Sequence, residues 1–208
     1  MNDEPFSAAM SSPYSACVLK AGYSVAQPDG TFKADGTITL LTGPRNILVD
    51  TGGPWDRDFL LGSLEERGLS AGDINVVVGT HGHSDHVGNL GLFPGALLVV
   101  GFDVCRGDTY VDSGLARGEL GQGIIPTPGH SGQDVSVKVR GTASGELLVA
   151  GDLFENYQDE SSWRELSLNP ALQQQHRQRA LQTADIIIPG HGLPFRVTRG
   201  AQEPQEAS

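Results

Sequence analysis

The chain has 208 residues, a formal charge of −11 and 38% apolar residues, with 28 glycines and 12 prolines. This length and composition suit one globular α/β domain, and they exclude collagen, a disordered acidic protein and a disulfide-stapled miniprotein. The acidic balance argues weakly against a nucleic-acid partner, because such partners usually meet a basic surface.

The two ends of the chain differ in composition from its middle. Residues 1–13 are polar and rich in serine and proline, so we expect a flexible arm there. One domain is expected over residues 14–199, followed by a disordered tail over residues 200–208. No apolar run approaches the roughly 18 residues of a membrane span, and the acidic start is unlike a signal peptide. These features predict a soluble, intracellular protein with no membrane partner, in which Cys17 and Cys105 are reduced thiols.

Short apolar runs, separated by glycine and proline, dominate the domain. They predict strands over residues 15–19, 36–41, 46–49, 74–78, 97–100, 135–139, 146–150 and 185–188. A polar hairpin is expected over residues 23–33. Pro54 and Gly68 mark the start and end of a helix over 55–67, and an Asn-Pro pair begins a second helix over 170–183. Many short strands with interspersed helices indicate an α/β fold with two sheets.

Five of the six histidines lie in three glycine-flanked loops, which read THGHSDH, PGHSG and PGHG. A fourth loop, AGD, has the same design with a carboxylate. Each loop lies at or just beyond the end of an apolar run, so the fold can bring the loops to one edge. The candidate metal ligands are His81, His83, Asp85, His86, His130, Asp152 and His191. The sixth histidine, His176, is expected to be exposed on the second helix.

Imidazole and carboxylate ligands suit zinc, iron or manganese. Seven ligands are too many for one tetrahedral ion, but they match two ions that share a bridging carboxylate. We therefore expect two zinc ions per chain, with iron or manganese as alternatives. Such a pair lowers the pKa of a shared water, and a metal-bridging hydroxide then attacks a carbonyl carbon or a phosphorus. The ligands alone do not choose between a phosphodiester, a thioester and a lactam.

The order of these motifs, preceded by LVDTGG, resembles the metallo-β-lactamase superfamily over nearly the whole predicted domain. The resemblance implies an αββα sandwich with the site at one edge, between the sheets. Carried over by position, it implies that His81, His83 and His130 hold a first metal, that Asp85, His86 and His191 hold a second, and that Asp152 bridges the two. Asp85 would also orient the attacking hydroxide as the catalytic residue, and Asp50 would orient ligand histidines from behind.

Longer stretches, among them VVGTHGHSDHVGNLGLFPGA and TPGHSGQDVSV, resemble a branch implicated in RNA cleavage at histone pre-mRNA 3′ ends. That resemblance implies an endoribonuclease that acts on RNA phosphodiesters, a homodimer, and a location in the cytosol and nucleus. The inserted domain with which nuclease relatives clamp RNA is absent from this sequence. The candidate RNA track is a loose group of arginines: Arg164, Arg177, Arg179, Arg196 and Arg199.

Three other functions compete with RNA cleavage. A thioesterase of the glyoxalase II type would share all seven ligands, although that branch usually adds a C-terminal glutathione-binding segment. A persulfide dioxygenase would use one iron held by His81, His130 and Asp152. A metal-holding binding module without catalysis is the fourth reading, and the complete ligand set argues against it.

Overall fold

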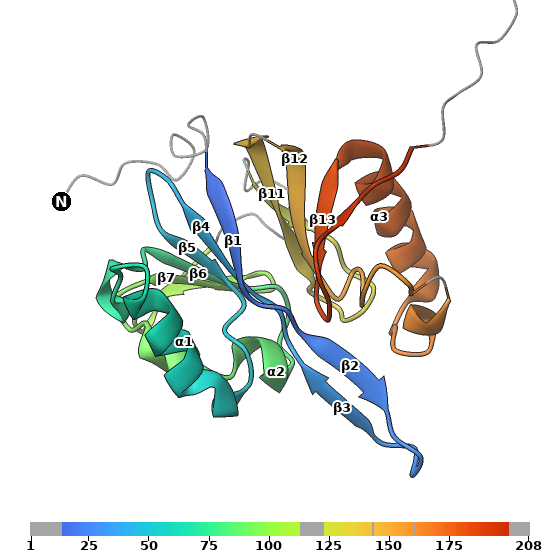
Figure 1. The fold of residues 1–208 in the computed structure, drawn as a ribbon, viewed down its shortest axis with the longest axis horizontal. Coiled ribbons are helices and arrows are strands. Elements are labelled where there is room, and N and C mark those ends of the chain that lie inside the picture. The colour runs from blue at the N-terminus through green and yellow to red at the C-terminus, as the bar shows by residue number, and fades with distance from the viewer. Residues whose placement is uncertain (1–13, 113–122, 143, 160, 200–208) are drawn as a thin grey trace, which may run out of the picture.

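The computed structural model describes residues 14–112, 123–142, 144–159 and 161–199 (Figure 1). The predicted arm over residues 1–13 and the predicted tail over residues 200–208 lie outside these ranges. Among the helices of the described ranges, none is long and apolar enough to cross a membrane.

The first sheet has seven strands in the order β1-β4-β5-β6-β7-β8-β9. They are β1 (Ser15–Lys20), β4 (Ile38–Thr42), β5 (Ile47–Val49), β6 (Val76–Gly79), β7 (Leu97–Val100), β8 (Asp103–Arg106) and β9 (Thr109–Val111). Strands β5, β6 and β7 are parallel, and the other pairs are antiparallel. The parallel strands therefore end at one edge of the sheet.

The second sheet has five strands in the order β10-β11-β12-β13-β14. They are β10 (Ile124–Pro126), β11 (Val135–Thr142), β12 (Gly145–Gly151), β13 (Ile186–Pro189) and β14 (Phe195–Arg196). Because β11 is antiparallel to both β10 and β12, and β12 is parallel to β13, the strands β10, β12 and β13 share one direction. A separate hairpin of β2 (Tyr23–Ala26) and β3 (Phe32–Asp35) projects from the molecule (Figure 1).

The two sheets face each other, with helices on both outer sides (Figure 1). The helices are α1 (Arg57–Glu65), which follows a 3₁₀ turn over Pro54–Asp56, α2 (Ser84–Val87) and α3 (Pro170–Thr183). Shorter 3₁₀ turns lie at Ala71–Asp73, Leu90–Leu92 and Ser162–Arg164. This arrangement confirms the predicted αββα sandwich.

The burial of alternate strand residues explains the layers. Leu41 and Val49 pack against residues of the second sheet, whereas their neighbours Leu40 and Leu48 pack in the cluster that includes α1. In the second sheet, Leu148 contributes to a third cluster, together with residues of α3. Successive side chains of a strand point to opposite faces, so each sheet needs a cover on both faces. In the sandwich, the opposite sheet covers the inner face of each sheet, and helices cover the outer face.

The predicted helices and strands match the structure within a few residues. The strand expected from residue 36 begins instead at Ile38, because the N–H of Gly36 donates to the carbonyl of Asp85 and turns the chain toward the histidine loop. Four short strands of two to four residues each were not predicted as strands: β8, β9, β10 and β14. Runs that short carry too little periodicity to be distinguished from loops.

Candidate metal centre

Every candidate ligand loop follows the carboxyl end of a strand. Asp50 follows β5, the THGHSDH loop follows β6, His130 follows β10, Asp152 follows β12 and His191 follows β13. Backbone hydrogen bonds tie these loops together, one between the two sheets and one within the second sheet. The N–H of Val135 donates to the carbonyl of Thr80 at 2.8 Å, and the N–H of Gly190 donates to that of Gly151 at 3.0 Å. Ligands usually bind at the carboxyl ends of strands in such sheets.

The first group of ligand atoms comprises three ring nitrogens and one carboxylate oxygen. The Nε2 of His81 lies 2.8 Å from the Nδ1 of His83, which lies 3.2 Å from the Nε2 of His130. The Oδ2 of Asp152 lies 3.5 Å from the Nε2 of His81 and 3.3 Å from that of His130. These atoms all lie within 4.8 Å of one another. Asp152 is buried, while His83 is exposed, so the group reaches from the interior to the surface.

The second group shares the same carboxylate. The Nε2 atoms of His86 and His191 lie 3.5 Å apart. The Oδ1 of Asp152 lies 3.2 Å from His86, and its Oδ2 lies 3.3 Å from His191. The Oδ2 of Asp85 approaches these two nitrogens at 3.9 and 3.8 Å. Asp152 therefore faces both groups, as a bridging carboxylate would.

These residues fit metal ions by distance and by chemistry. A tetrahedral ion with bonds of about 2.0–2.1 Å would separate its ligands by about 3.3–3.4 Å. In the first group, the separations of 3.2, 3.3 and 3.5 Å lie near this value, and the separation of 2.8 Å between His81 and His83 is shorter. The Oδ1 of Asp152 is buried and has no hydrogen-bond partner. Gly190 belongs to this fit, because a Cβ at that position would overlap the Oδ1 of Asp152.

Asp50 supports the centre from behind. Its carboxylate accepts hydrogen bonds from the N–H and the hydroxyl of Thr80, at 2.7 and 2.9 Å, and lies 2.8 Å from the Nδ1 of His86. Among the described residues it is the only one other than glycine with a positive φ, of 59°. Aspartate tolerates this left-handed conformation better than most residues, and here it aims the carboxylate at His86. The structure thus places Asp50 where its predicted orienting role requires.

The base of the hairpin supports His191. The Nδ1 of His191 lies 3.0 Å from the main-chain oxygen of Asp35, at the end of β3. The carboxylate of Asp35 is ion-paired with Lys20 and accepts a hydrogen bond from the indole N–H of Trp55. Lys20 also pairs with Asp56. This partly buried cluster was not predicted from the sequence, because its members lie far apart in the chain.

The buried charges of the centre shift one another's pKa values. Burial lowers the pKa of His81, and the neighbouring His86 lowers it further. Burial also opposes protonation of His86 and His191, but nearby carboxylates together outweigh it: Asp152 and Asp50 raise the pKa of His86, and Asp152 and Glu155 raise that of His191 to about 9. Burial would raise the pKa of Asp152, yet His86, His81 and His191 hold it well below its usual value. Without metal, His86 and His191 therefore form imidazolium–carboxylate pairs, whereas the ring of His81 is neutral.

Metal uptake is expected to release protons. At pH 7.5 the raised pKa values keep His86 and His191 protonated, whereas a metal needs neutral imidazole. Filling the second group should therefore release about two protons per chain, and affinity should rise with pH until about pH 9. Calorimetric metal titrations in two buffers of different ionisation heat would measure this number. Equal heats in both buffers would contradict the expectation.

The predicted arginine track does not lie on one surface. Arg177 is buried, donates to Asp159 at 2.7 and 3.0 Å, and is unavailable to RNA. Arg179 lines a groove on one flank of α3, whereas Arg196 and Arg199 line a hollow on its other flank. Arg164 lies against the ring of Trp163 and donates to Gln174. His176 was predicted to be exposed, but it is half-buried. Burial lowers its pKa, and the positive charge of Arg179 lowers it further.

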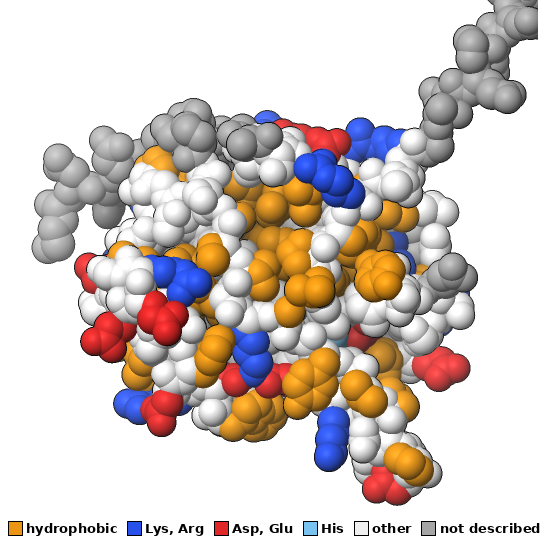
Figure 2. Space-filling model, in the orientation of Figure 1, with side chains coloured by type: hydrophobic (Ala, Val, Ile, Leu, Met, Phe, Trp, Pro, Cys, Tyr) orange, Lys and Arg blue, Asp and Glu red, His pale blue; other side chains and the backbone are white. Residues whose placement is uncertain are grey.

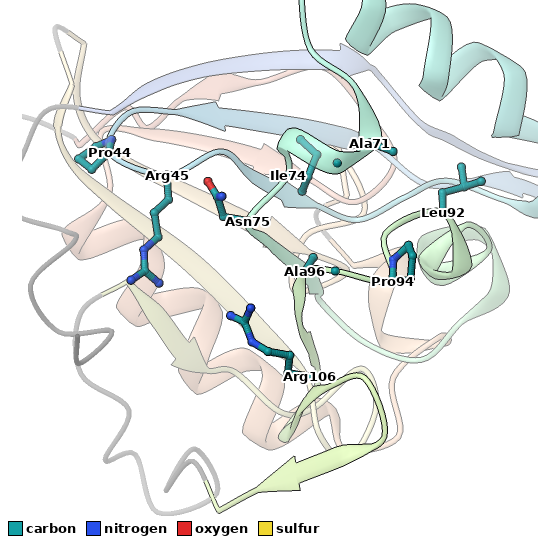
Figure 3. Close-up of a pocket in the computed structure, with 11 residues that line it drawn as sticks. Pro44, Arg45, Ala71, Ile74, Asn75, Leu92, Pro94, Ala96 and Arg106 are labelled. Carbon is teal, nitrogen blue, oxygen red and sulfur yellow. The ribbon is translucent and has the colours of Figure 1, made fainter. Parts of the chain in front are cut away.

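A separate cavity of about 670 Å³ lies away from the metal centre. Arg45 and Arg106 extend into the same space, near Asn75 (Figure 3). These residues lie at the amino ends of β5 and β6 and on β8, so the cavity opens at the edge of the sheet opposite the histidines. It contains none of the candidate ligands.

The family model of the metallo-beta-lactamase superfamily matches residues 34–102. The chain is 48% identical to metallo-beta-lactamase domain-containing protein 1 of Homo sapiens, over 93% of this chain and 86% of that protein. The fold is similar to that of a putative metallo-beta-lactamase from Thermotoga maritima, with a TM-score of 0.64, 20% identity, and coverage of 88% and 99% of the two chains. A quorum-quenching N-acyl homoserine lactone lactonase gives a TM-score of 0.59 at 20% identity, with coverage of 88% and 93%.

Proposed function

Because the chain belongs to the metallo-beta-lactamase superfamily of metal-dependent hydrolases, we propose that it uses two zinc ions to cleave RNA phosphodiester bonds. The observation that carries the metal chemistry is the sharing of Asp152 by two groups of ligand atoms. One iron on His81, His130 and Asp152 would leave the second group unused, so the geometry favours hydrolysis over the dioxygenase reaction. RNA as the substrate is supported by the motif resemblance described above.

The candidate ligands have different proposed roles, which follow from their positions and their burial. His81, His83 and His130 would hold one ion and Asp85, His86 and His191 the other, with Asp152 facing both groups. When bound, two such ions supply an acidified water and polarise the oxygen of the scissile bond.

Asp85 is the more exposed of the two carboxylates, with 15% of its side chain accessible against 4% for Asp152. It is therefore placed to orient the attacking water and to carry its proton toward the leaving oxygen, while Asp152 stays ionised and structural.

A cationic groove on the α3 side of the second sheet supports a polyanionic substrate. The groove, of about 410 Å³, lies between α3 and strands β10 and β11, and Lys138, Arg140 and Arg179 line it. Glu146 pairs with Lys138 at 3.0 Å and with Arg140 at 3.7 Å, so the cations outnumber the carboxylate. The lining also includes Thr127, three residues before His130. Lys138 and Arg140, with Arg179 from the predicted track, are therefore the candidate contacts for a phosphate backbone.

Substitution of Asp85 by asparagine tests the function. We expect the zinc-loaded wild type to cut end-labelled single-stranded RNA carrying a histone 3′ end, and the Asp85→Asn variant to lose at least about 100-fold in rate because it lacks a proton carrier. Both proteins need matched metal content. An Asp58→Asn variant, in an exposed carboxylate of α1, is the control and should cut like the wild type. Intact RNA with a fully loaded wild type would contradict the proposal.

A thioester is the second candidate substrate, and the hairpin is the reason. Tyr23, Val25 and Phe32 are about half exposed there. Figure 2 shows apolar side chains on the projecting hairpin, whose base contacts His191. Exposed apolar surface beside a polar centre suits an acyl chain better than a phosphodiester. Turnover of an acyl-glutathione by a protein that leaves RNA intact would favour this second function.

A further inference from the structure

The buried ligand histidines differ in how their outward-facing nitrogen is satisfied. Three of them have a partner: the Nδ1 atoms of His81, His86 and His191 lie 3.2, 2.8 and 3.0 Å from oxygens of Thr80, Asp50 and Asp35. The fourth, His130, has none, and its Nδ1 is buried without a hydrogen bond. Ligand histidines almost always donate this second N–H to an oxygen, so His130 lacks a partner that its neighbours have.

The carboxylate of Glu155 faces this nitrogen. Glu155 is only 4% exposed, and its Oε1 is also buried without a hydrogen-bond partner. The two unsatisfied atoms, Oε1 of Glu155 and Nδ1 of His130, lie 3.8 Å apart. A hydrogen bond of ordinary length needs an approach of about 0.6–1.1 Å, which small rotations about the side-chain torsions of Glu155 provide.

The main chain holds Glu155 firmly at this position. Its N–H donates to the Oδ2 of Asp159 at 2.7 Å, and its carbonyl accepts from the N–H of His191 at 2.8 Å. Asp159 is itself fixed by two hydrogen bonds from Arg177. Glu155 is therefore anchored through both of its main-chain groups, and its carboxylate faces the Nδ1 of His130.

We propose that Glu155 is a positioning residue that fixes the His130 ring by accepting a hydrogen bond from its Nδ1–H. A neutral imidazole that presents Nε2 to a metal must carry its proton on Nδ1, and a fixed acceptor there selects this tautomer and the angle of the ring. The inference rests on the metal centre proposed above, but it is independent of the bond that is hydrolysed.

Two variants of Glu155 separate positioning from other roles. Glu155→Gln keeps a carbonyl oxygen that can accept the hydrogen bond, whereas Glu155→Ala removes it. We expect the alanine variant to bind Zn²⁺ about 10–100-fold more weakly, in competition with a chromophoric chelator, and the glutamine variant to retain most of the affinity. The visible spectrum of the Co²⁺-loaded protein should change in the alanine variant and resemble the wild type in the glutamine variant. The exposed Glu165→Ala is the matched control.

Each alternative outcome is decisive. Unchanged affinity and spectrum in the alanine variant would overturn the proposal. So would equal losses in both variants, because a carboxylate would then be needed as such. The rival role for Glu155 is direct binding of a metal ion, because its Oε2 lies 3.9 Å from the Nε2 of His191.

Failure of the wild type to take up Co²⁺ would instead contradict the metal centre itself, and with it the proposed function. If the alanine variant does not fold, the Nδ1–H proton resonance of His130 in the zinc-loaded protein provides the test. It should shift between the wild type and the glutamine variant, and an unchanged resonance would overturn the proposal.

Discussion

Asp152→Asn is expected to lose both metal ions and nearly all hydrolytic turnover. The two carboxylate oxygens of Asp152 lie 3.2–3.5 Å from nitrogens of four histidines, two from each ligand group. Asparagine would present one neutral oxygen and an amide group that repels cations. Loss of an outer partner already costs about 10–100-fold in metal affinity, so loss of the shared ligand should exceed about 100-fold.

Metal content after dialysis against a weak chelator, followed by an activity assay, would measure the effect. Asp103→Asn, in an exposed carboxylate of β8, is the control and should retain both metals. A variant at Asp152 that keeps two ions per chain would contradict the assignment of this residue as the bridge. Retention of one ion would instead mean that the two groups are independent sites.

The convergence of the candidate ligands could be predicted because each of their loops follows an apolar strand. The strands leading to His81, Asp152 and His191 are continuous apolar runs, and parallel strands deliver their carboxyl ends to one edge. All four loops also carry a glycine directly before a candidate ligand, and at Gly190 a side chain would overlap Asp152. Local sequence and global topology agree at these positions, which is why an α/β fold with two sheets could be predicted from the pattern, while the αββα sandwich came from the family resemblance.

Glu155 escaped prediction because its role depends on a contact across the fold. In the sequence it follows Leu153 and Phe154 and matches no ligand spacing. The available signal was a glutamate directly after two apolar residues. A position next to such residues is often buried, and a buried glutamate needs a partner. The partner nitrogen on His130 comes from another strand, 25 residues earlier in the chain. No local pattern encodes that distance.

The bounds of helix α3 were predicted correctly, but its buried polar face was not, for a different reason. Its sequence, PALQQQHRQRALQT, is polar almost throughout, which is typical of a solvated helix. The structure buries Gln173 and Arg177, whose side chains donate to the carbonyls of Asp152 and Leu153. These polar side chains replace an apolar stripe and satisfy the backbone of the loop that carries the bridging ligand. Hydrophobic periodicity does not register packing of this kind.

Arg177→Ala is expected to destabilise the protein by about 3–5 kcal/mol, because it leaves the buried carboxylate of Asp159 without its partner. The guanidinium also lies 4.2 and 4.6 Å from the rings of Phe154 and Trp163, so its removal opens a space between two buried aromatic residues. Urea unfolding at one fixed metal concentration would measure the change in the free energy of unfolding.

Arg179→Ala is the matched control for this variant. Arg179 lies two residues further along the same helix but is exposed, so its loss should change stability by no more than about 0.5 kcal/mol. Equal effects of the two substitutions would show that the pair with Asp159 contributes nothing beyond a surface charge. The distinction also bears on the centre, because Asp159 holds the N–H of Glu155. A folded Arg177→Ala protein should therefore bind metal more weakly than the wild type, whereas Arg179→Ala should affect only the binding of a polyanion.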